Sequence, residues 1–149
     1  MNSKRMMASA FLIVSLAVGT ASFGDDYPGV KATRLITATT ASNGQKLSYL
    51  RTDRPEVTAL VVEIPPGAET GWHLHTVPVY AYMLAGAITV EMADGTSYEF
   101  KEGDAILEVR DTPHNGRNRG IVPAKLVVFY TGEEGKPNVT RLNKPAAGN

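Results

Sequence analysis

The three histidines of this chain lie where a single metal ion could bind all of them. His73 and His75 form an H-x-H pair, and His114 follows about one hairpin later. Alternate side chains of an extended strand point to the same face, so the two imidazoles of the pair can reach a common point. A third imidazole from a neighbouring strand would complete a three-nitrogen site for a divalent transition metal.

The chain contains no cysteine, and any metal site must therefore use nitrogen and oxygen donors. The same absence excludes a thiol nucleophile, a redox-active thiol and disulfide bonds. Stability must come from core packing, supplemented by a bound metal.

The first residues have the pattern of a targeting signal rather than of a folded domain. Lys4 and Arg5 are followed by a mostly apolar stretch at 6–18 and then by small residues. This pattern is typical of a secretory signal peptide, predicted at 1–21, and it is too short for a stable membrane span. The alternative is an uncleaved N-terminal anchor. We expect export to the periplasm or secretion, with no membrane attachment after cleavage.

Cleavage would leave 13 basic and 15 acidic residues, a net charge of −2. The chain has no run of basic residues, so its charge pattern gives no indication of a nucleic-acid partner. The remaining residues, 22–149, are enough for one compact domain with a substantial core.

Residues 22–149 have the pattern of an all-β domain. Short apolar segments alternate with glycine, proline and asparagine turns, and no sustained helical periodicity is present. Asp94-Gly95 is a strong hairpin signal, and the tail 136–149 is expected to be loose. Many short antiparallel strands predict a sandwich or small barrel that can hold one small ligand. Strands are expected at 34–40, 46–50, 57–64, 72–75, 79–84, 87–92, 96–100, 105–109 and 125–130.

Two segments resemble the paired sequence motifs of the cupin superfamily. The matching residues are Gly67, His73, His75 and Gly86 in the first motif and Gly103, His114 and Asn118 in the second. The chain looks most like the small exported single-domain cupins of bacteria. The resemblance implies a double-stranded jelly-roll β-barrel of six to eight strands, with the three histidines as metal ligands inside it.

The chain departs from the cupin pattern in both motifs. The glutamate of the first motif would fall at Val79, whose side chain cannot bind a metal. In the second motif, Val109 and Asp111 replace the usual proline and glycine. We therefore expect a three-histidine variant that lacks the motif glutamate.

Three neutral imidazoles leave the charge of a divalent ion uncompensated, which makes it a stronger Lewis acid. Zinc with three histidines and a water is a known catalytic arrangement. Ferrous iron with three protein ligands keeps positions for substrate and dioxygen. The resemblance also extends to iron cupins without the carboxylate, some of which are thiol dioxygenases. We expect iron, with zinc, nickel and copper as alternatives.

Glu108 is the candidate catalytic residue, because it lies in an apolar strand just before the third histidine. It could orient an imidazole, act as a general base or point outward to solvent. Strand alternation places Met83 on the same face as Val79, and Asn118 occupies the position of the cupin asparagine. We expect these three residues to line the substrate pocket.

Two functions remain open. One is a metalloenzyme acting on a small molecule, first an iron-dependent dioxygenase and second a hydrolase, lyase or isomerase of a small organic acid. The other is a non-catalytic periplasmic module that holds a small ligand or the metal itself. An inward-pointing Glu108 would favour the enzyme, and an outward-pointing one the binding module. A homodimer is also expected from the resemblance.

Overall fold

The computed structural model describes residues 28–144. The chain divides into two units, Met1–Thr33 and Arg34–Asn149, and all described strands belong to the second. The signal peptide predicted at 1–21 lies outside the described residues. Within residues 28–144 no helix has the length and apolar character needed to span a bilayer.

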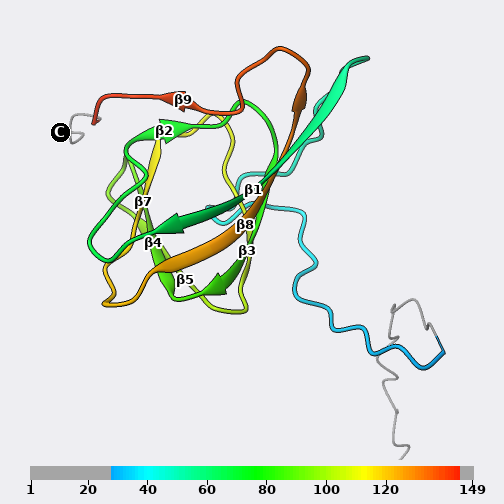
Figure 1. The fold of residues 1–149 in the computed structure, drawn as a ribbon. Coiled ribbons are helices and arrows are strands. Elements are labelled where there is room, and N and C mark those ends of the chain that lie inside the picture. Colours follow the sequence, from blue (N-terminus) through cyan, green and yellow to red (C-terminus); the bar gives the residue numbers. More distant parts are fainter. Residues whose placement is uncertain (1–27, 145–149) are drawn as a thin grey trace, which may run out of the picture. The chain divides into compact units, whose positions relative to one another are not determined.

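Nine β-strands and no helix make up the described part of the unit Arg34–Asn149 (Figure 1). The strands are β1 (Pro55–Ile64), β2 (His73–Leu74), β3 (Val79–Ala85), β4 (Ala87–Met92), β5 (Ser97–Lys101), β6 (Ala105–Leu107), β7 (His114–Arg117), β8 (Ala124–Glu133) and β9 (Thr140–Arg141). They form a four-stranded sheet in the order β1-β8-β3-β6 and a five-stranded sheet in the order β5-β4-β7-β2-β9. All described pairings are antiparallel, and the predicted all-β jelly roll is confirmed.

The core lies between the two sheets. In β3 and β8 buried residues alternate with more exposed ones, so one face of each strand points inward. These inward side chains meet Ile88 from the five-stranded sheet in a single buried cluster. Full burial of a large aliphatic side chain contributes about 1.5–3 kcal/mol, and this cluster therefore holds the sheets together.

Residues 34–40 and 46–50 were wrongly predicted as strands. Within the described residues they contribute only an isolated bridge. The segment between them binds another part of the chain instead. The side-chain amide of Gln45 donates to Arg110 O at 3.0 Å and accepts from Arg110 N at 2.7 Å. The expected turn does form, with Ala41 N donating to Gln45 O and Leu47 N to Thr39 O, but the ladder extends no further than the bridge between Thr40 and Lys46.

The expectation of a loose tail from residue 136 was wrong for β9. Its two residues pair with β2, with Arg141 opposite His73 and Thr140 opposite Leu74. The β2 edge carries backbone groups that need hydrogen-bond partners, and the tail provides them. The tail therefore belongs to the sheet that carries the first two histidines, apart from residues 145–149, which lie outside the described part.

Two backbone positions fit the spacing of the cupin motifs. Gly86 has φ +70, and a Cβ atom there would lie 2.5 Å from the carbonyl oxygen of Pro123. Glycine is thus required at the end of the first motif. Asp111 has φ 51 in the left-handed region, at the place where the second motif has its glycine. Aspartate tolerates this conformation better than most residues.

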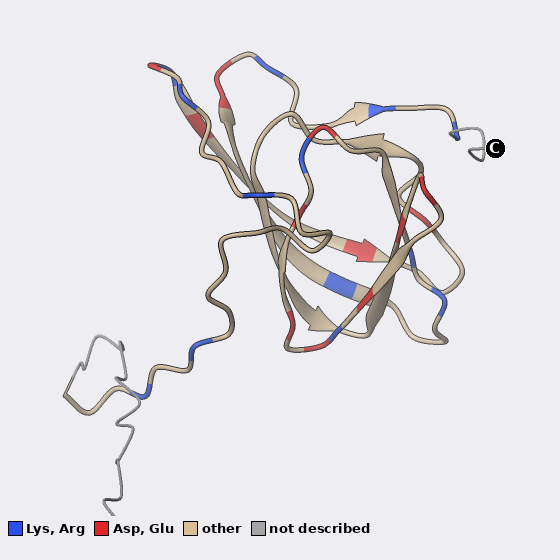
Figure 2. Cartoon of the chain, turned by 180° about the vertical axis from the view of Figure 1, so that it is seen from behind, with Lys and Arg blue, Asp and Glu red and all other residues tan. Residues whose placement is uncertain are grey.

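Acidic and basic segments are interspersed over the described strands and loops (Figure 2). The exposed Glu63 and Lys125, for example, lie opposite each other on β1 and β8, with their charged atoms 3.6 Å apart. Exposed pairs of this kind contribute only about 0–1 kcal/mol each. The fold depends more on the core and on the hydrogen bonds around the histidines.

Candidate metal centre

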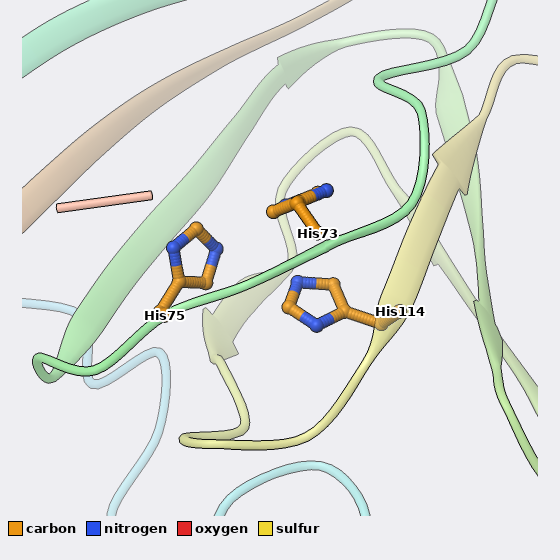
Figure 3. Close-up of side chains that lie close together, drawn as sticks. All are labelled: His73, His75 and His114. Carbon is orange, nitrogen blue, oxygen red and sulfur yellow. The ribbon is translucent and has the colours of Figure 1, made fainter. Parts of the chain in front are cut away.

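The three imidazole rings point toward one another from two neighbouring strands (Figure 3). His73 begins β2, His75 follows that strand directly, and His114 begins β7 opposite His73. The ring centroids are 4.3 to 5.0 Å apart, and one donor nitrogen from each ring lies within 4.8 Å of the others. The structure therefore brings together the three histidines expected as ligands.

A main-chain carbonyl fixes the orientation of each imidazole through its Nδ1 atom. The pairs are His73 with Gly71 at 2.7 Å, His75 with Asn138 at 3.0 Å and His114 with Thr112 at 2.8 Å. A carbonyl oxygen can only accept, so each Nδ1 carries the hydrogen. In the neutral ring the Nε2 atom then presents its lone pair, which is the form that binds a metal.

Burial favours the neutral form of a histidine, which is the form that binds a metal ion. The three side chains are only 9%, 2% and 3% exposed, in chain order. Burial is the main cause that lowers the pKa of His73 to about 4, and the charges of His114 and His75 add to it against the Gly71 hydrogen bond. His73 is thus neutral at pH 7. The buried Nε2 of His114 makes no hydrogen bond to the described residues, and a divalent transition metal would satisfy it.

Glu108 points into the same cluster. Its Oε2 atom lies 3.1 Å from His75 Nε2 and 3.5 Å from His114 Nε2, and the side chain is 20% exposed. Burial alone would raise the pKa of Glu108, but the close approach of the His114 and His75 rings outweighs it and lowers the pKa to about 2. The carboxylate is ionised at neutral pH. Of the orientations considered for Glu108, the outward one is wrong.

A cavity of about 80 Å³ lies beside the histidines and Glu108. Most of its other lining side chains are aliphatic or aromatic, and no lysine or arginine among the described residues lines it. Tyr130 contributes its ring, 5.6 Å from that of His75 between centroids. Burial raises the pKa of Tyr130, and the charge of Glu108 raises it further, so the phenol stays protonated at neutral pH. The space suits a small, mainly apolar molecule.

The three residues expected to line the substrate pocket do not line this cavity. Val79 and Met83 do face inward, but they are packed into the hydrophobic core. The side-chain amide of Asn118 donates to the carbonyls of Ile64 and Val122, both at 2.8 Å. Asn118 therefore holds two backbone segments together rather than a ligand.

Sequence reasoning missed Tyr130 and the main-chain carbonyls that orient the three imidazoles. Tyr130 lies on the inward face of β8 with Leu126 and Val128, and the period-2 pattern of that strand could have indicated it. Asn138 contributes its main-chain carbonyl to His75. Since every residue has a carbonyl, no side-chain pattern could have indicated Asn138.

The comparison with known families is consistent with this geometry. The Cupin domain family matches residues 60–130, the segment that holds the three histidines and Glu108. Residues 60–130 of this chain form a cupin domain. No curated protein matches the sequence.

Solved structures with this cupin's fold include two enzymes. The DMSP lyase DddQ from Ruegeria pomeroyi DSS-3 is 21% identical, with a TM-score of 0.52 over 60% of this chain and 45% of that one. An oxalate decarboxylase–formate complex from Lactobacillus farciminis is 21% identical, with a TM-score of 0.50 over 58% of this chain and 26% of that one. This cupin thus spans less than half the length of either. Identities this low show a shared fold and no more.

Proposed function

We propose that this cupin is an exported metal-dependent enzyme that acts on a small organic molecule, with a non-haem iron dioxygenase as the reaction class. The observation that carries the proposal is the convergence of three Nε2 lone pairs beside a small, mostly apolar cavity. An ionised carboxylate at the same point, Glu108, supports an enzyme over a passive binding site. Export is proposed from the signal-peptide pattern at 1–21.

We propose iron as the metal, with zinc, nickel and copper as alternatives, since imidazole donors suit all four. A ferrous ion held by His73, His75 and His114 would supply dioxygen chemistry. The protein itself contributes three converging imidazoles, an apolar wall that excludes water and a protonated phenol at Tyr130. Because no lysine or arginine of residues 28–144 lines the cavity, an acidic substrate would need the metal to bind its charge.

The reaction class is tested by oxygen uptake. The ferrous protein should consume dioxygen with one member of a panel of thiols, phenols and small carboxylic acids. The His73→Ala variant, handled identically, is the matched control and should show only the background rate. Absence of uptake across the whole panel would exclude these substrates and favour the second candidate.

That second candidate is a non-catalytic periplasmic module that binds a small ligand or the metal itself. The apolar lining of the cavity favours it, because few polar groups are present to direct a reaction. A small apolar ligand that binds the metal-loaded protein tightly, without oxygen uptake or chemical change, would support this function.

A further inference from the structure

Position 79 carries valine where the first cupin motif has glutamate, but the neighbouring strand supplies a carboxylate at the same place. Tyr80 on β3 pairs with Leu107 on β6. The next pair in this antiparallel register is Val79 with Glu108, and Glu108 N donates to Val79 O at 3.0 Å. Directly opposite residues of two antiparallel strands carry their side chains on the same face. Glu108 therefore lies beside Val79 and faces the histidines.

We infer that Glu108 is the fourth metal ligand, supplied from across the strand pair in place of the carboxylate that Val79 lacks. The inference rests on the proposed metal centre and names one more of its ligands. It replaces the expectation of a centre without any carboxylate.

The separations of the Glu108 carboxylate from two of the three imidazoles fit a shared ion. Metal–nitrogen and metal–oxygen bonds of about 2.0–2.2 Å place neighbouring ligand atoms about 3 Å apart. Glu108 Oε2 is 3.1 Å from His75 Nε2 and 3.5 Å from His114 Nε2. Little movement would be needed for the carboxylate and these two imidazoles to bind the same cation.

The hydrogen bonds of the imidazoles argue against an orienting role for Glu108. A carboxylate that orients a ligating histidine accepts from the ring nitrogen that faces away from the metal. Here the Nδ1 atoms of His75 and His114 already donate to the carbonyls of Asn138 and Thr112. Glu108 instead approaches Nε2, the atom that faces the other two rings, so a shared proton or a shared metal ion must lie between the two atoms, and a metal is the occupant that all three imidazoles can share.

The backbone around Glu108 is fixed from both sides, as a ligand position requires. On one side Glu108 N is bonded to Val79 O. On the other, Ser42 N and Oγ donate to Leu107 O at 3.1 and 2.9 Å. Gln45 binds both main-chain groups of Arg110. The segment 42–45, which forms no strand, thus holds the carboxylate in position.

The test measures the affinity for manganese(II) and zinc(II) in four proteins. They are the parent, the single variant Glu108→Gln, the double variant that combines Glu108→Gln with Val79→Glu, and the control Glu63→Gln. Glu63 is an exposed carboxylate that does not line the cavity and is the matched control. Removing the carboxylate should weaken manganese binding at least about tenfold, and zinc binding less, because oxygen ligands suit manganese better than imidazoles do. Restoring a carboxylate at position 79 should recover the manganese affinity, and the control should match the parent.

A manganese affinity of Glu108→Gln within about twofold of the parent would overturn the inference and leave the three-histidine centre intact. So would a folded double variant that binds manganese no better than Glu108→Gln. A parent protein that binds neither ion would instead contradict the proposed metal centre itself.

A crystal structure of the zinc-loaded parent gives a second measurement that needs no variant. A Glu108 oxygen at about 2.0–2.2 Å from the ion supports the inference. A carboxylate that stays beyond bonding distance, with zinc on the three histidines, overturns it.

Discussion

His75 and Asn138 are joined by a hydrogen bond of 3.0 Å from the imidazole Nδ1 to a main-chain carbonyl 63 residues further along the chain. The C-terminal segment thereby fixes the ring of a proposed metal ligand. The same segment pairs through β9 with the strand that begins at His73. A part of the chain expected to be loose is thus built into the site.

Ending the chain after Pro137 should therefore weaken zinc binding roughly tenfold, because His75 loses the acceptor that fixes its ring and tautomer. Competition with a chromogenic chelator measures the affinity. Ending the chain after Lys144, which keeps β9, is the control and should retain the parent affinity. Equal affinities of the two truncated proteins would mean that the hydrogen bond has no part in metal binding.

Asp111 adopts a left-handed conformation, and its N–H donates to His75 O at 2.8 Å. Because glycine has no Cβ penalty at positive φ, Asp111→Gly should be more stable than Asp111→Ala by about 1 kcal/mol. Urea unfolding of the two metal-free variants measures the difference. An alanine variant at least as stable as the glycine variant would show that the loop does not need this conformation.

The stability of the metal-free protein should depend on pH through His73. Burial lowers the pKa of His73 from 6.5 to about 4, so the unfolded chain binds a proton between these values and the folded chain does not. The free energy of unfolding is therefore highest above pH 6.5, and it falls by roughly 3 kcal/mol as the pH decreases to about 4. The pKa of Glu108 is lowered from 4.5 to about 2, so its contribution changes only below pH 4.5 and overlaps that of His73 only at the acid end.

Urea unfolding at several pH values, with a chelator present, measures this dependence. His73→Gln is the comparison, since glutamine does not titrate and its protein should lose less stability between pH 6.5 and 4.5. The same slope in both proteins would show that His73 keeps an ordinary pKa in the folded state.

The cavity can be tested separately from the metal. Val128 lines it, whereas the adjacent Val127 does not and points to the other face of β8. Val128→Phe should reduce substrate-dependent oxygen uptake at least about tenfold with unchanged metal content, at an overpacking cost of about 1–3 kcal/mol. Val127→Phe is the matched control. Parent-like uptake by a folded Val128→Phe protein would place the substrate elsewhere.

The sequence predicted those parts of the fold that depend on local pattern. The alternation of apolar residues located β1, β3, β4, β5 and β8 within a few residues. The spacing of His73, His75 and His114 identified the cluster, because alternate side chains of a strand point to the same face.

Features that depend on long-range register could not be predicted in the same way. Whether Glu108 faces inward depends on the β3–β6 register, which the intervening hairpin sets. The segment 34–50 has the composition of a hairpin and forms its turn, but the local pattern could not indicate that the Gln45 side chain binds Arg110. Val79 was expected to line the pocket. Its side chain does point inward, but it packs in the hydrophobic core and does not reach the cavity.

The metal content of the purified protein tests the central claim most directly. Elemental analysis of parent protein exported by its host should find about one transition-metal ion per chain. His114→Ala should hold far less, because one of three converging imidazoles is lost. The exposed Arg119→Ala is the control and should match the parent. Equal metal content in His114→Ala and the parent, or no metal in either, would contradict the account.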